Sequence, residues 1–168
     1  MTTFEPNQQI IDHLNKVAEI SNYIWQKGWA ERNGGNISVN LTGLQSVTEG
    51  VLASSRYHEK NCPEAAAGML LFVTGTGERI RELESQLKQV ACIIQIDNRA
   101  KGYHIIWGGE KGPNFRPTSE FLTHLQLHLT NERSGCQNKC LVHAHPTELL
   151  AASYHPEFEQ NSERFNRV

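Results

Sequence analysis

The sequence has no long hydrophobic run and no excess of positive charge. Its longest apolar stretches, residues 69–73 and the broken run 90–96, fall far short of the roughly 18–20 residues that a transmembrane helix needs. Sixteen Lys and Arg residues stand against 18 Asp and Glu residues, a net charge of -2, so no basic surplus exists to neutralise nucleic-acid phosphates. We therefore expect a protein that acts on neither membranes nor nucleic acids.

Secretion signals, abundant cysteine and nucleotide-binding motifs are also lacking. The N-terminal sequence MTTFEPNQQIIDHLNK has neither the basic nor the apolar region of a secretory signal. Only four cysteines occur, and in a chain without such a signal we expect thiols or metal ligands rather than disulfides. Neither a Walker pattern nor a complete GxGxxG is found, so no nucleotide cofactor is predicted. These features predict a cytoplasmic protein.

The length and the hydrophobic pattern predict one α/β domain over residues 1–168. A chain of 168 residues is long enough to bury a core without disulfide support. Apolar residues at three- and four-residue spacing predict a helix over 7–27, with Gly28 at its C-terminal end. Alternation predicts a half-buried strand over 37–41. Further strands are expected over 69–73, 90–97, 103–107 and 141–145, helices from Pro117 and over 147–154, a helical turn over 79–83, and long loops over 42–68 and 131–139.

The sharpest chemical feature is the pair His143 and His145 in the expected strand 141–145. Residues i and i+2 of a strand point to the same face, so the two imidazoles would emerge side by side while Val142 and Ala144 face the core. Two imidazoles on a strand can form half of a zinc site. A pair of plain surface histidines is the alternative interpretation.

Two other groupings of potential metal ligands are poorer candidates. Cys136 and Cys140 precede the histidine pair, but an extended strand would have to curl around one ion to form a zinc finger. His124 and His128 share one helical face without the glutamate of an HExxH motif, which favours a polar or packing role.

Glu120 and two glycine-rich turns complete the candidate chemistry. Glu120 lies in the first turn of a predicted helix, just after the hydroxyl groups of Thr118 and Ser119. It is either an acid/base group or a carboxylate that only complements the helix dipole. The turns 32–36 and 74–77 resemble anion-binding nests, although most such turns bind nothing.

Taken in order, the segments GWAERNGGNIS, FVTGTG, GYHIIWG, RPTSEF and CLVHAH resemble the class II aldolase/adducin family. The resemblance covers essentially the whole chain and is least clear over 42–68. It implies a three-layer α/β/α sandwich with a mixed, mostly antiparallel sheet, and a homotetramer of C4 symmetry with active sites between subunits. The activity it implies is zinc-dependent, reversible cleavage of a sugar phosphate, L-rhamnulose 1-phosphate, to dihydroxyacetone phosphate and L-lactaldehyde.

The resemblance also implies a role for each matching residue. His143 and His145 would bind Zn²⁺, and Glu120 would be the catalytic carboxylate. The phosphate of the substrate would be held by Asn33, Asn36, Thr76, Gly77, Thr118 and Ser119.

The pattern departs from the family near its end. The family takes a third zinc histidine from a segment downstream of the pair, whereas the only later histidine here is His155. Family members run longer, so we expect this chain to correspond to their N-terminal part, with the last elements of the fold absent. Other activities of the scaffold stay open: fuculose-phosphate aldolase, pentulose-phosphate epimerase, thioribulose-phosphate dehydratase and a non-catalytic adducin-like binding module.

Overall fold

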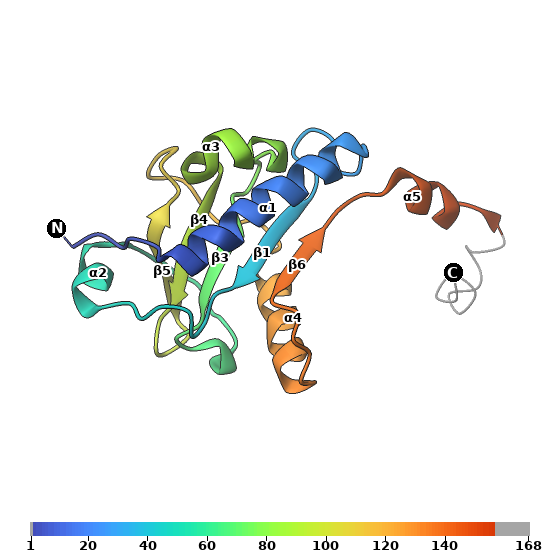
Figure 1. Cartoon of the computed structure of the whole chain (residues 1–168). Coiled ribbons are helices and arrows are strands. Elements are labelled where there is room, and N and C mark those ends of the chain that lie inside the picture. Colours follow the sequence, from blue (N-terminus) through green and yellow to red (C-terminus); the bar gives the residue numbers. More distant parts are fainter. Residues whose placement is uncertain (1, 157–168) are drawn as a thin grey trace.

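A six-stranded sheet forms the centre of the computed structural model, which describes residues 2–156 (Figure 1). The strand order is β2-β5-β4-β3-β1-β6, and each neighbouring pair is antiparallel. The strands are β1 (Asn36–Asn40), β2 (Arg56–Glu59), β3 (Leu70–Thr74), β4 (Ala91–Ile96), β5 (Gly102–Gly108) and β6 (Cys140–His143).

Helices cover both faces of this sheet. The helices of the chain are α1 (Gln8–Gln26), α2 (Glu49–Ser54), α3 (Leu83–Val90), α4 (Phe121–Arg133) and α5 (Thr147–Ser153), with 3-10 turns η1 (Glu64–Ala66) and η2 (Ile80–Glu82); α5 does not cover the sheet. In Figure 1, α1 crosses one face of the sheet, and α4 lies against the other near β1 and β6. The predicted α/β fold with helices on both faces of a sheet is confirmed, but the sheet is not mixed, since all five strand pairs among residues 2–156 are antiparallel.

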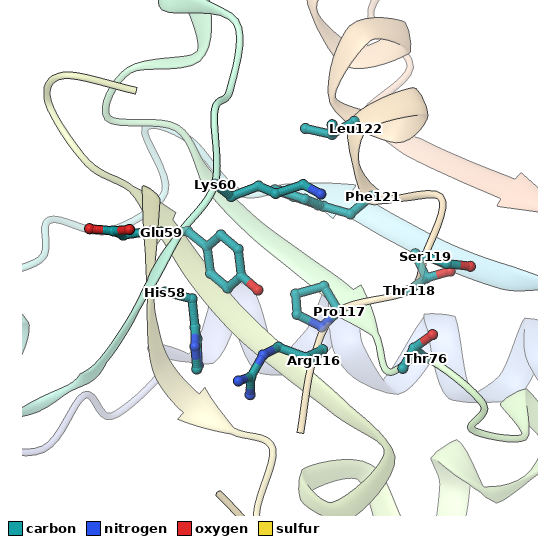
Figure 2. Close-up of a pocket in the computed structure, with 11 residues that line it drawn as sticks. His58, Glu59, Lys60, Thr76, Arg116, Pro117, Thr118, Ser119, Phe121 and Leu122 are labelled. Carbon is teal, nitrogen blue, oxygen red and sulfur yellow. The ribbon is translucent and has the colours of Figure 1, made fainter. Parts of the chain in front are cut away.

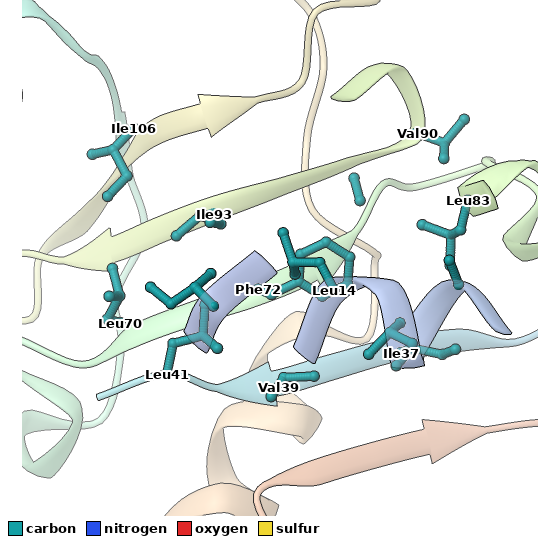
Figure 3. Packing of buried hydrophobic residues seen from close by; sticks show 14 of the residues in the cluster. Leu14, Ile37, Val39, Leu41, Leu70, Phe72, Leu83, Val90, Ile93 and Ile106 are labelled. Carbon is teal, nitrogen blue, oxygen red and sulfur yellow. The ribbon is translucent and has the colours of Figure 1, made fainter. Parts of the chain in front are cut away.

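The larger hydrophobic cluster lies between α1, α3 and the sheet (Figure 3). It forms because the apolar stripe of α1, including Leu14, meets the odd-numbered residues of β1, Ile37 and Val39. Asn7 caps α1 by accepting a hydrogen bond from the Ile10 amide at 2.9 Å. Helix α1 thus packs over β1, whose first residue, Asn36, borders the candidate site.

A second cluster fills the opposite face, between α4, η1 and the sheet. Phe121, Leu125 and Leu129 of α4 pack there against residues of β3, β4 and β5. This cluster packs α4 against the sheet, and the N-terminal end of the helix lies beside the start of β1.

The segment 42–68 is not the single long loop that the sequence predicted. It contains α2, capped by Thr48, the edge strand β2 and the turn η1. β2 pairs with β5, which is more than 40 residues away in the sequence, so a local pattern could not reveal it.

Two other predicted segments have different bounds in the structure. The predicted turn at 79–83 continues into α3, which has a kink at Gln86. The predicted loop 131–139 begins too early, because α4 runs to Arg133.

The strand that carries the histidine pair is shorter than predicted. β6 ends at His143, and His145 lies beyond it. Val142 does not face the core but is 45% exposed, because β6 forms the edge of the sheet and α5 extends away from the body without a buried residue (Figure 1). Within residues 2–156 no helix is long and apolar enough to span a membrane.

Candidate active site

The turn between α1 and β1 brings two glycines against the histidine segment. Gly35 has a φ of +81°, a conformation that favours glycine. A Cβ atom on Gly35 would lie 2.9 Å from the His143 carbonyl oxygen, and one on Gly34 would lie 3.2 Å from Nδ1 of His145. The RNGGN sequence therefore permits a close approach that residues with side chains would prevent.

The two imidazoles of the histidine pair converge. Nε2 of His143 and Nε2 of His145 lie 3.1 Å apart. The backbone of β6 places His143 opposite Asn36 of β1, and the His145 amide donates to the Trp29 carbonyl at 2.7 Å. Two nitrogen ligands of one tetrahedral zinc ion lie about 3.3 Å apart, given zinc–nitrogen distances of about 2.0–2.1 Å. The pair therefore fits a shared zinc ion.

Glu120 contacts the other ring nitrogen of His143. Its Oε2 atom meets Nδ1, which leaves Nε2 of the same ring pointing toward His145. Partial burial raises the pKa of the Glu120 carboxyl, but hydrogen bonds with His143 and Asn36 outweigh it and bring the pKa below its ordinary value. The carboxylate is therefore ionised at neutral pH.

Asn36 links the glycine-rich turn to the carboxylate. It is 8% exposed, and its side chain hydrogen bonds to Glu120. Its Oδ1 atom is buried and has no hydrogen-bond partner among residues 2–156. A buried acceptor without a partner is costly, so this atom is a natural contact for a hydroxyl group of a ligand.

The second glycine-rich turn runs beside the start of α4. The Thr118 amide donates to the Thr74 carbonyl at 2.8 Å, and the Thr76 amide donates to the Arg116 carbonyl at 2.9 Å. Because these two amides are engaged in the backbone, the two threonines offer side-chain hydroxyls to a ligand. Within the turn 74–77, which the sequence suggested as an anion-binding nest, the Thr76 amide is therefore not available to a ligand.

One cleft of about 350 Å³ gathers all nine of the predicted site residues. Its lining consists of Asn33, Gly34, Gly35, Asn36, Gly75, Thr76, Gly77, Thr118, Ser119, Glu120, His143 and His145. The structure thus brings together four segments, 33–36, 75–77, 118–120 and 143–145, which are separated in the chain by about 40, 40 and 23 residues.

A second pocket, of about 430 Å³, shares a wall with this cleft (Figure 2). Thr76, Thr118 and Ser119 belong to both, and the second pocket adds the cationic side chains of Lys60 and Arg116. Sequence reasoning missed Lys60, because it lies in the segment expected to be a loop. Its positive charge adds to the attraction of the region for anions.

The alternative metal groupings do not form. Among residues 2–156, no three or more His, Cys, Asp or Glu side chains gather closely enough to enclose a metal ion, so the pair His143 and His145 likewise offers two ligands without a third. Cys140 is exposed, and Cys136 is half-buried with a free thiol. His124 and His128 are buried and hydrogen bond to Ser38, which fits the polar role expected for them.

Comparisons with known proteins show the family of this chain. The family described as "Class II Aldolase and Adducin N-terminal domain" matches residues 15–167. The rhamnulose-1-phosphate aldolase of Yersinia pseudotuberculosis serotype IB is 36% identical over an alignment of 146 residues that covers 83% of this chain and 52% of that protein. The enzyme of the same name from Bacteroides thetaiotaomicron is 34% identical over an alignment of 160 residues that covers 93% of this chain and 57% of that protein.

A solved structure is also similar. The sugar-phosphate aldolase from Thermotoga maritima matches with a TM-score of 0.72 and 30% identity, over 90% of this chain and 61% of that chain. The chain spans about half the length of the curated relatives it matches.

Proposed function

The chain belongs to the class II aldolase and adducin N-terminal domain family, and we propose that its cleft is the zinc and phosphate site of an aldolase. The reaction proposed is reversible cleavage of L-rhamnulose 1-phosphate to dihydroxyacetone phosphate and L-lactaldehyde. The observation that carries the proposal is the single cleft in which a converging histidine pair, an ionised carboxylate and hydroxyl-bearing turns lie together.

His143 and His145 would hold the zinc ion through their Nε2 atoms, which the 3.1 Å separation allows. When bound, the ion supplies positive charge beside the substrate's ketone oxygen, where negative charge develops as the carbon–carbon bond breaks. The contact of Glu120 with Nδ1 of His143 keeps the proton on that nitrogen and leaves Nε2 free as a ligand.

Glu120 would act as the general base and general acid of the reaction. In the synthetic direction it removes a proton from the hydroxymethyl carbon of dihydroxyacetone phosphate, and in the cleavage direction it returns one. Its lowered pKa keeps it ionised and able to accept that proton at neutral pH. General-base catalysis typically contributes about 10²–10⁴ in rate.

The phosphate end of the substrate would lie against the turns. The side chains of Thr76, Thr118 and Ser119 provide hydroxyl donors on one wall, and Asn33 provides an amide on the other. Such contacts fix the orientation of the substrate and so lower the entropic cost of reaching the transition state. Lys60 and Arg116, in the neighbouring pocket, raise the local positive potential.

Following the family resemblance, we propose that the complete site is assembled between subunits of a C4 tetramer in the cytoplasm. The edge position of β6 supports this, because it leaves His145 exposed to contact from another subunit.

The test is a coupled assay for dihydroxyacetone phosphate, using the chain purified with zinc. Cleavage of L-rhamnulose 1-phosphate that is abolished by His143→Ala and His145→Ala, but not by the matched control His13→Ala on α1, would support the proposal. If the chain cleaves L-fuculose 1-phosphate faster than L-rhamnulose 1-phosphate, the substrate proposed here would be replaced by L-fuculose 1-phosphate. A chain that binds zinc and cleaves neither sugar would contradict an aldolase activity of this polypeptide and favour an adducin-like binding role.

A further inference from the structure

A row of polar side chains lies buried between β1 and α4. Asn36, Ser38 and Asn40 point to the α4 side of β1 and are only 8%, 1% and 4% exposed. The sequence predicted a half-buried strand with this polar face in water. The prediction is wrong because α4 covers that face.

The partners of this row form one stripe along α4. Ser38 Oγ bonds to Nδ1 of His124 at 2.7 Å and to Nε2 of His128 at 2.8 Å, and Asn40 Nδ2 donates to Glu132 Oε1 at 2.8 Å. At the start of the row, the Asn36 side chain hydrogen bonds to the carboxylate of Glu120, beside the histidine pair. We call these contacts the polar ladder; its members are Asn36, Ser38, Asn40, Glu120, His124, His128 and Glu132.

Hydrogen bonds and apolar contacts constrain the helix differently. The apolar side of α4, with Phe121, Leu125 and Leu129, packs into the second hydrophobic cluster. Such packing is non-directional and tolerates small shifts of the helix along or about its axis. Hydrogen bonds of 2.7–2.8 Å tolerate much less, since they weaken steeply with distance and angle.

From this arrangement we propose that Ser38, His124 and His128 are positioning residues, which set the placement of α4 and thereby hold Glu120 against His143. The proposal rests on the proposed function, because it assigns the ladder's role through Glu120. Ser38 is its centre, since one hydroxyl satisfies a ring nitrogen of each histidine. Removing that hydroxyl leaves two buried ring nitrogens without their partner and frees α4 to shift.

The ladder does not serve as a second metal site. Nδ1 of His124 and Nε2 of His128 are both bonded to the Ser38 hydroxyl, and both imidazoles are buried, at 4% exposure for His124 and 1% for His128. The ladder therefore acts on the site through the position of the helix.

The experiment measures the tautomer of His143 in the metal-free full chain by ¹⁵N NMR of the imidazoles, together with the Kd for Zn²⁺ by competition with a chromogenic chelator. In the unaltered protein we expect the proton of His143 on Nδ1. Ser38→Ala should give a mixture of tautomers and raise the zinc Kd about 10-fold, at the lower end of the effect of losing a supporting partner of a metal ligand. The control Leu129→Ala weakens the packing of α4 but should leave the tautomer unchanged.

An unchanged tautomer in Ser38→Ala, or an equal change in Leu129→Ala, would overturn the positioning role. If Ser38→Ala does not fold, Ser38→Cys decides the matter, because a thiol keeps the volume but hydrogen bonds weakly. Absence of zinc binding by the unaltered protein would count against the proposed function alone, since the tautomer still reports on the ladder.

Discussion

Mild acid should destabilise this protein through His128. Burial, and to a lesser degree the nearby charges of His124 and Lys139, lower the pKa of His128 from 6.5 to about 4. Above pH 6.5 the imidazole is neutral in both the folded and the unfolded state. Between pH 6.5 and 4 the unfolded chain binds a proton that the folded protein excludes, so the free energy of unfolding falls as the pH falls. With these pKa values the loss is about 2 kcal/mol at pH 5 and about 3 kcal/mol at pH 4.

The assay is urea unfolding at pH 7 and pH 5 for the unaltered protein and for His128→Gln, which cannot take up the proton. The variant is less stable at pH 7, because it loses a hydrogen bond with Ser38. Between pH 7 and pH 5 the free energy of unfolding of the variant should fall by about 2 kcal/mol less than that of the unaltered protein. Equal losses for the two proteins would refute the reasoning and show that His128 does not titrate abnormally in the folded state.

Four further predictions follow from the site and the core. Glu120→Gln should lower turnover 100-fold or more, the usual scale for a lost general base, while the affinity for a phosphate-bearing analogue, measured by calorimetry, changes little. Zinc held by His143 and His145 should be removed by chelator dialysis, as metal analysis would show; stoichiometric zinc that survives would contradict a two-histidine site. Gly35→Ala should cost about 2 kcal/mol or more in urea unfolding, because φ is +81° and the new Cβ would lie 2.9 Å from the His143 carbonyl. Phe72→Ala, at a fully buried position, should cost about 3–5 kcal/mol in the same assay without changing the tautomer of His143.

Local sequence patterns determined much of the fold. The spacing of apolar residues located α1, and Gly28, with a φ of +73°, ends it as predicted. The order of the RNGGN, TGTG, PTSE and HxH motifs indicated the family, which the comparison over residues 15–167 shows. The helix and its end were accessible because each depends on neighbours within a few residues, and the family was accessible because each motif is a short segment whose order can be read along the chain.

Tertiary structure alone decided the features that join distant segments. Strand β2 exists through its pairing with β5, and the face of Ser38 is buried through contacts 86 and 90 residues away, with His124 and His128. The side of His143 that Glu120 contacts depended likewise on how α4 meets the sheet. A polar residue on an alternating strand looks the same in the sequence whether water or a helix covers it. Only the packing of α4, set by the whole core, distinguishes the two.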